Sequence, residues 1–396
     1  MTRSPLVLAA LASAAVPGLD PVSVEGVRTR AGGSFDIAFV TDQQERRWVI
    51  KAPVTHGAGA ELEAVATLGP LLARRLELAM PLVRGSVTVP EGRAIVYLRL
   101  PGRPLDFRAL PPGGLAAALG RALGHLHNIE TAVFDEAGRP SYDAEAHRRR
   151  QLSELDRAAA TGHVPTNLLT RWEQRLEDIS LWRFAPTAVH GSFVGDNVLA
   201  SFEDDDDGES GEVRGVLGWE ESRVGDPADD FADLVRLAPA AAVDDVLRAY
   251  AQSRVERPDG NLLARAHLAA EMTPMRTLLR ALVGGAREVV DQAAASLREL
   301  DEQITVADEQ RALEAEMTSQ PWSPAASPVP EPDWDATQPH RMFPDQSATQ
   351  AIGETLDRPG DEAGRLQPDE DAPAGRDEGL PQRPEDDQPI PTRPSD

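Results

Sequence analysis

The chain has 396 residues, a formal net charge of −25 and no cysteine. This length allows two or three structural units with cores of their own. The acidic balance argues against nucleic acid or an anionic membrane as the main partner, and the lack of cysteine excludes disulfides and zinc–thiolate sites.

The N-terminal stretch at residues 6–16 is apolar and rich in alanine, with Arg3 as the single basic residue before it. It resembles a weak signal peptide, but its composition favours an amphipathic helix broken at Pro17 and Gly18. No apolar run reaches the roughly 18 residues that a membrane-spanning helix needs. We therefore expect a cytoplasmic protein without membrane segments.

Strands and one helix are predicted between residues 22 and 100. Phe35, Ile37 and Phe39 alternate with other side chains, as in a half-buried strand. A polar turn at 42–45 and a returning strand at 47–51 follow. The segments after that are a helix around 61–72 and strands at 87–89 and 95–98.

Beyond a break at residues 101–104 the pattern becomes mainly helical. Helices are predicted at 115–128, 143–160, 166–180 and, with interruptions, 227–316, and short strands at 187–190, 197–202 and 213–219. The predicted fold class is α+β and bilobal. A small lobe of sheet and helix occupies residues 1–98, and a larger helical lobe occupies residues 99–317.

The last segment, residues 318–396, contains 17 Asp and Glu against 6 Arg, and 15 of the 33 prolines. Such a composition buries too little apolar surface to offset the loss of chain entropy on folding. The sequence therefore predicts a disordered acidic tail. Its charge would suit a basic protein partner, and a purely solvating role is the alternative.

One lysine, Lys51, stands among 40 basic residues, at the end of the apolar run 48–50. A lysine offers a compact point charge where arginine offers a planar fork, and phosphate oxygens are a common partner of such a charge. Lys51 is thus a candidate for phosphate binding. Chance retention of one lysine in a lysine-poor chain is the alternative.

Three ordered motifs follow in the helical part: AVHGSFVGDNVL at 188–199, GVLGW at 215–219 and GDPADDFA at 225–232. Together they resemble the aminoglycoside and macrolide phosphotransferase family, which shares the protein-kinase-like fold. The resemblance spans about residues 20–300. It implies transfer of the γ-phosphate of ATP or GTP to a hydroxyl of a small-molecule acceptor.

The resemblance assigns several residues. Lys51 would contact the nucleotide phosphates, and Glu61 would pair with it from the following helix. Glu61 is preferred to Glu63 because it shares the apolar face of that helix, although a surface glutamate at a helix start is the alternative. Tyr97 opens the hinge that would stack the purine, and Asn197 matches the family's metal ligand.

Other matches are weaker. The glycine-rich segment 32–34 could cover the phosphates. His190 resembles a structural residue that braces its loop rather than a general base. Asp226, which precedes Pro227, and Asp230 resemble loop and helix-start residues.

Two positions depart from the family pattern. Ser192 stands where the family has its catalytic aspartate, and Gly218 stands where it has a metal-binding aspartate. A serine hydroxyl is a poor proton acceptor at neutral pH, and a positioned acid–base group contributes about 10²–10⁴ in rate. Glycine offers no side-chain oxygen ligand to Mg²⁺. Glu220, two residues further along a predicted strand, would share the face of Gly218 and could substitute with Asn197.

Three hypotheses follow from these matches and departures. The first is a pseudokinase-like member that binds a nucleotide or a partner without turnover. The second is an active small-molecule kinase with a rearranged metal site that uses Glu220 and Asn197. The third is a scaffold protein whose acidic tail recruits partners.

Overall fold

A five-stranded antiparallel sheet forms the N-terminal part of the computed structural model, which describes residues 3–27, 33–203 and 211–319. The strand order is β1-β2-β3-β5-β4. The strands are β1 (Pro21–Val27), β2 (Phe35–Asp42), β3 (Arg47–Pro53), β4 (Val83–Val89) and β5 (Gly92–Leu98). The register of β2 and β3 places Ile37 opposite Lys51 and Phe39 opposite Val49. Opposite residues project to the same side of a sheet, so these four side chains share one face.

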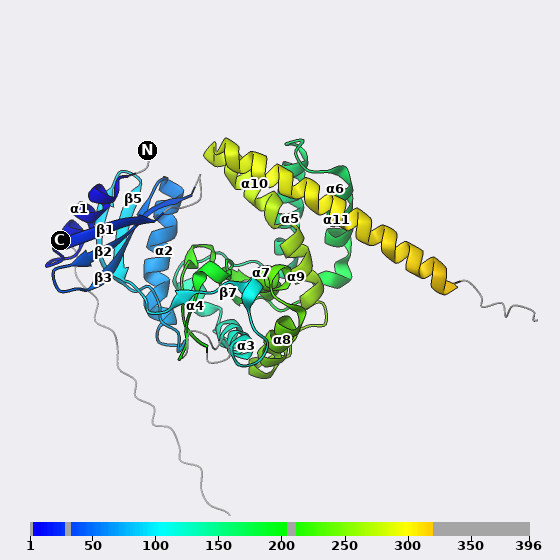
Figure 1. Cartoon of the computed structure of the whole chain (residues 1–396), viewed down its shortest axis with the longest axis horizontal. Helices are drawn as coiled ribbons and strands as arrows, with labels where there is room; N and C mark the ends of the chain where they lie inside the picture. The colour runs from blue at the N-terminus through cyan, green and yellow to red at the C-terminus, as the bar shows by residue number, and fades with distance from the viewer. Residues whose placement is uncertain (1–2, 28–32, 204–210, 320–396) are drawn as a thin grey trace, which may run out of the picture. The chain divides into compact units, whose positions relative to one another are not determined.

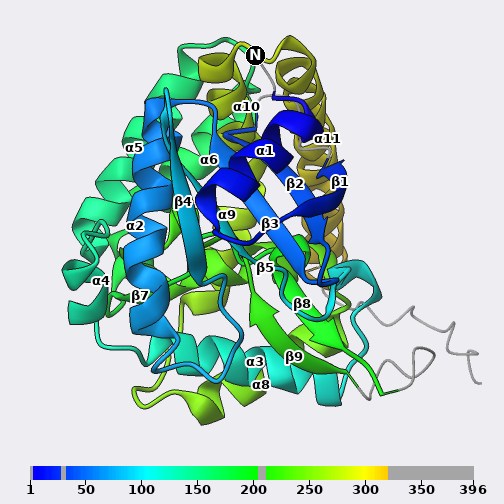
Figure 2. The same cartoon turned by 90° about the vertical axis from the view of Figure 1, so that its left-hand side faces the viewer.

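Helix α1 (Pro5–Ala15) covers the other face of the sheet (Figure 2). It begins at the cap residue Ser4, whose Oγ accepts a hydrogen bond from the Val7 amide, and Pro5 occupies its first turn. Leu8 and Ala12 are buried in one cluster with the sheet residues around Ile50. The helix predicted before Pro17 is therefore confirmed as part of the folded core.

Helix α2 (His56–Leu72) links the sheet to the helical part. Leu62 packs with Val49 and Ile95 on the sheet. One and two turns later, Val65 and Leu68 belong to the main cluster of the helical part. A single amphipathic face thus packs against both parts of the molecule, as residues three and four apart on a helix allow.

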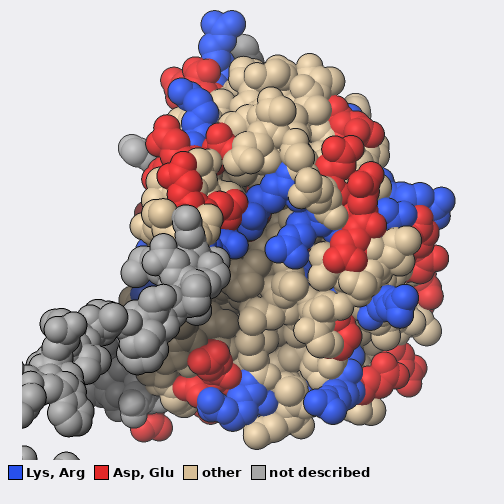
Figure 3. Space-filling model, turned by 90° about the vertical axis from the view of Figure 1, so that its right-hand side faces the viewer, with Lys and Arg blue, Asp and Glu red and all other residues tan. Residues whose placement is uncertain are grey.

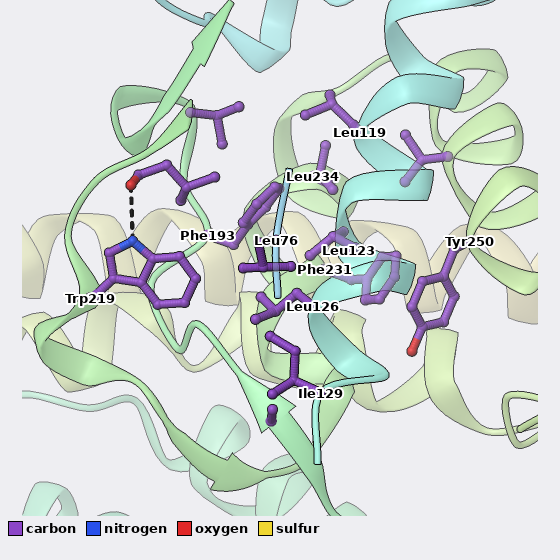
Figure 4. Packing of buried hydrophobic residues seen from close by; sticks show 14 of the residues in the cluster. Leu76, Leu119, Leu123, Leu126, Ile129, Phe193, Trp219, Phe231, Leu234 and Tyr250 are labelled. Carbon is purple, nitrogen blue, oxygen red and sulfur yellow. Dashed lines mark hydrogen bonds between the residues drawn. The ribbon is translucent and has the colours of Figure 1, made fainter. Parts of the chain in front are cut away.

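The helical part contains nine helices within residues 99–203 and 211–319, and Figure 1 shows their arrangement. They are α3 (Gly114–His127), α4 (Ala132–Glu136), α5 (Ala144–Ala159), α6 (Thr166–Glu177), α7 (Ala232–Leu237), α8 (Ala240–Ser253), α9 (Leu262–Glu271), α10 (Thr273–Gly284) and α11 (Arg287–Ser319). One core forms between α3 and α8 (Figure 4), and a second joins α5, α6, α10 and α11.

Short strands lie in the segments between these helices. β6 (Arg103–Pro104), β8 (Val198–Ser201) and β9 (Glu212–Val216) form one small antiparallel sheet, and β7 (Thr187–Val189) pairs with β10 (Arg223–Gly225). The strand predicted over 213–219 ends earlier, at Val216. Trp219 turns back there, and its indole Nε1–H donates to the Val216 carbonyl at 2.9 Å (Figure 4).

The predicted α+β class, with a small sheet lobe and a mostly helical lobe, is confirmed. No helix in the described part of the chain is long and apolar enough to cross a membrane. Charges of both signs lie on the face shown in Figure 3, where basic side chains gather around a hollow. Residues 320–396, which hold nearly all of the predicted acidic tail, lie outside the described residues.

Candidate functional site

The loop after β7 is held by one buried carboxylate. Asp230, which is fully buried, accepts hydrogen bonds at 2.7 Å from the main-chain amides of His190 and Gly191. Its Oδ2 also lies 3.0 Å from Nε2 of the buried His127. Because a buried carboxylate is costly unless its oxygens are satisfied, these contacts fix the loop relative to the core. The interpretation of Asp230 as a loop residue agrees with this geometry.

His190 joins two segments of the site. Its Nε2 lies 2.8 Å from the Leu217 carbonyl, and its Nδ1 lies 3.2 Å from the Ser192 amide. An amide is a donor and a carbonyl an acceptor, so the neutral Nε2–H tautomer satisfies both contacts. Burial lowers the pKa of His190 and keeps this form at neutral pH. Both ring nitrogens are engaged in bracing the loop, in agreement with the structural role predicted for this residue.

Asp226 caps the next turn, as expected. Its Oδ1 accepts from the Ala228 amide at 3.0 Å, which is an N-cap contact. The buried guanidinium of Arg265 binds Asp226 at 2.7 Å and Asp259 at 2.8 Å. This network anchors the third motif to helix α9.

Asn197 connects Ser192 to the turn after β9. Its Nδ2 donates to the Ser192 carbonyl at 2.9 Å, and its own carbonyl accepts from the Leu217 amide at 2.8 Å. The preceding residue, Asp196, is exposed. Ser192 and Asn197, two residues of the first motif, are therefore in contact.

Gly218 adopts a left-handed conformation, with φ of 78° and ψ of 40°. A Cβ added there would lie 2.5 Å from Nδ2 of Asn197. The turn Trp219–Glu221 is a 3₁₀ helix that begins directly after Gly218. The expectation that Glu220 shares a strand face with Gly218 is thus wrong, because the chain folds into a tight turn at that point.

Lys51 pairs with Glu220, not with the predicted Glu61. Lys51 Nζ lies 2.6 Å from Oε1 of Glu220, and both side chains are largely buried, with exposed fractions of 11% and 13%. The ammonium also lies 4.3 Å from the centre of the Phe35 ring, within cation–π range. The tight turn brings Glu220 to the sheet, so this ion pair joins the two parts of the molecule.

Arg139 holds the turn that carries Glu220. Its Nη2 donates to the Glu220 carbonyl at 2.6 Å, and its Nε donates to the Ser222 carbonyl at 2.8 Å. No sequence pattern marked this arginine, because its partners are main-chain atoms about 80 residues away.

Glu61 lies close to this ion pair without joining it. Burial raises its pKa, and the nearby carboxylates of Glu221 and Glu220 raise it further, whereas the charges of Arg139 and Lys51 lower it. The helical periodicity therefore placed Glu61 on the correct face but could not identify the nearest partner of Lys51.

Tyr97 is packed inside the sheet face. It is 8% exposed and clusters with Val49, Leu62 and Ile95. Burial, together with the nearby Glu220 carboxylate, raises the pKa of its hydroxyl. Contact of Tyr97 with a purine stays a prediction. In the predicted phosphate loop, Gly32 lies outside the described residues.

The residues present do not fit a magnesium site as they are placed. Gly218 has no side-chain ligand atom, and the Glu220 carboxylate is bound by Lys51, whereas the contact of Asn197 with Ser192 uses Nδ2 and not the side-chain oxygen that would ligate a metal. Mg²⁺ prefers several oxygen ligands in octahedral geometry. Among the described residues, no group of three or more His, Asp or Glu side chains could hold a metal ion.

A cavity of about 180 Å³ opens beside Ser192. Side chains of α5 and α10, the loop at 191–194 and the segments that follow β9 line it. The lining residues are His147, Arg150, Gln151, Glu154, Gly191, Ser192, Phe193, Val194, Glu221, Arg223, Asp229, Ala232, Asp233, Thr273, Arg276 and Arg280.

Comparison with known proteins identifies the family. A model of the phosphotransferase enzyme family matches residues 25–259, which is more than half of the chain. The chain belongs to the phosphotransferase enzyme family. Among relatives of this chain, the uncharacterized protein YcbJ of Bacillus subtilis strain 168 is 24% identical over 232 residues, which cover 54% of this chain and 71% of the relative.

Solved structures show the same fold. The macrolide 2'-phosphotransferase MphH of Brachybacterium faecium, as apoenzyme, is 25% identical with a TM-score of 0.61, covering 74% of this chain and 97% of that one. A GDP complex of aminoglycoside 2'-phosphotransferase-IIIa is 16% identical with a TM-score of 0.63, covering 76% and 99%. This family member therefore has the bilobal protein-kinase-like fold that the motifs implied.

Proposed function

We propose that this family member binds ATP or GTP between its sheet lobe (residues 1–98) and its helical lobe (residues 99–317), and transfers the γ-phosphate at no measurable rate. The observation that best supports this proposal is the ion pair between Lys51 and Glu220. It lies beside Gly218, which is left-handed and lacks a carboxylate. A lysine suited to phosphate oxygens is present, while the turn next to it supplies a carboxylate that neutralises the lysine.

The face of the sheet that carries Lys51 supports nucleotide binding. Phe35, Ile37 and Phe39 are half-buried there, next to the buried Val49. Apolar side chains beside the Lys51 ammonium suit a molecule with a flat base at one end and phosphates at the other. The related aminoglycoside 2'-phosphotransferase-IIIa binds GDP with the same fold.

The acceptor side supports the absence of transfer. Phosphoryl transfer depends on positioning and on neutralising charge, and a carboxylate normally accepts the proton of the attacking hydroxyl. At position 192 the only side-chain group is a hydroxyl, on a loop fixed by His190 and Asn197. Replacing a carboxylate base with this weakly basic hydroxyl would by itself lower the rate of phosphoryl transfer by about 10²–10⁴-fold.

The test is calorimetric titration of the full chain with ATP and GTP, with Mg²⁺ or with EDTA, together with an assay for released phosphate. We expect binding in both buffers and no Mg²⁺-dependent turnover. Lys51→Met should weaken binding at least about tenfold, as loss of a charged contact predicts. Arg47→Met, an exposed change on the same strand, is the matched control.

Each outcome separates the hypotheses. Mg²⁺-dependent turnover by the unmodified protein would overturn the proposal and assign metal binding to Glu220 and Asn197. Failure to bind either nucleotide would remove the nucleotide role and favour a scaffold function. Equal binding by Lys51→Met and the parent would show that Lys51 does not contact phosphate.

A further inference from the structure

The cavity beside Ser192 has an unusual charge balance for this acidic chain. Four arginines and four carboxylates line it, so its formal charge is zero while the chain carries −25. His147 adds no charge near neutral pH, because burial lowers the pKa of its imidazole. The cavity is therefore neutral although the chain as a whole is strongly acidic.

The lining carboxylates are each paired with an arginine. Glu154 binds both Arg150, at 3.2 Å, and Arg276, at 3.4 Å. Asp229 binds Arg223 at 2.5 Å. The two remaining contacts are Asp233 with Arg236, which is not a lining residue, and Glu221 with Arg280 at 4.0 Å. A cationic ligand would have to compete with an arginine at each of these carboxylates.

Positive charge in the cavity is less fully matched. Arg150 and Arg276 share one carboxylate, and Arg280 reaches its own only at the outer limit of an ion pair. The exposed fractions of the Arg150 and Arg280 side chains are 48% and 67%. These guanidinium groups retain donors for the oxygens of a carboxylate or phosphate.

A second observation indicates a ligand with a hydrogen-bond donor. Gln151 lines the cavity and is 4% exposed, and its Oε1 has no partner within the described residues. Its Nε2 contacts Nε2 of His147, which orients the amide. A buried acceptor without a partner is unfavourable, and a ligand hydroxyl would satisfy it.

We propose that this cavity binds a small molecule that carries both a hydroxyl and an anionic group, a carboxylate or a phosphate, and that it discriminates against polycations. Arg150, Arg276 and Arg280 bind the anionic group, and the Gln151 amide accepts from a hydroxyl. The site requires no phosphoryl transfer. That the ligand lies next to a bound nucleotide rests on the proposed function. The preference of the cavity for an anionic ligand rests on the residues of the cavity alone.

The test is titration calorimetry of the full chain at constant ionic strength with four probes. Gluconate and glucose 6-phosphate present hydroxyls with a carboxylate or a phosphate, glucose is the neutral control, and kanamycin is the polycation. We expect at least one of the two acids to bind about tenfold or more tightly than glucose. The stronger of the two acids identifies the preferred anionic group.

Variants locate the binding. The double change Arg150→Gln with Arg280→Gln removes two exposed cations and should weaken binding of the acid about tenfold or more. Arg149→Gln, an exposed change on the same helix outside the cavity, should leave it unchanged. Lys51→Met should lose nucleotide affinity and keep acid affinity, so failure of the proposed function and failure of this inference give different results.

The inference is overturned by tighter binding of kanamycin than of both acids. It is equally overturned by acid binding that survives the double change, or by binding of neither acid at millimolar concentration. Thermal melting of the double variant checks that its fold is retained.

Discussion

Glu220→Gln is expected to tighten nucleotide binding while it slightly destabilises the fold. In the parent, Lys51 Nζ lies 2.6 Å from the Glu220 carboxylate, and both groups are shielded from water. Incoming phosphates must compete with this carboxylate for the charge of the ammonium. A hydrogen bond between charged groups contributes about 1.5–3 kcal/mol. Relief of this competition therefore lowers the Kd by about 10–150-fold.

The upper end of that range assumes that Lys51 is left without a partner. Glu61 lies near enough for the lysine charge to act on its pKa, so part of the gain would be lost to a new pair with Glu61. The stability change has the opposite sign, because the neutral amide replaces an ionic contact with a weaker one. We expect a loss of about 1 kcal/mol.

The assay is titration with ATP in EDTA at fixed ionic strength, beside urea unfolding of the same samples. Glu63→Gln, an exposed change on α2, is the matched control and should alter neither quantity. Unchanged or weaker ATP binding by Glu220→Gln would refute the idea that this carboxylate competes with phosphates, and would leave the ion pair a purely structural contact.

Further predictions concern other residues. The double change Ser192→Asp with Gly218→Asp should gain Mg²⁺-dependent phosphate release that neither single change gives, since base and metal ligand act as one unit. Gly218→Asp alone should lower the free energy of unfolding in urea by about 1–3 kcal/mol, because the φ of Gly218 is 78°. Glu61→Gln should raise the free energy of unfolding at pH 7 but not below pH 4.5, the ordinary pKa of glutamate. The raised pKa of Glu61 in the folded state means that its charged form, present at pH 7, destabilises the fold. Equal stability of the variant and parent at pH 7 would contradict this. Removing residues 318–396 should leave the melting temperature of the remainder nearly unchanged, and a large fall would show that the segment packs on the lobes.

The amino-acid sequence by itself determined the order and type of most elements. The alternation around Phe35 and the helical spacing from Glu61 to Leu72 encode which face of a segment is buried, and these local patterns do not depend on the partner. The motifs around His190 and Asp226 also placed their loop and cap roles correctly. The contacts behind these roles link residues within one motif, or residues of motifs that follow one another along the chain.

Only the tertiary structure decided which charges meet. Lys51 and Glu220 are 169 residues apart in sequence, and periodicity places Lys51 on a face of the sheet without identifying its partner in the helical part. The left-handed turn at Gly218 was equally hidden, because glycine adopts positive and negative φ with similar ease. The balanced charges of the cavity likewise depend on helices α5 and α10 and the turn after β9 coming together. Electrostatics acts between positions in space, so it becomes readable only once the fold has brought those positions together.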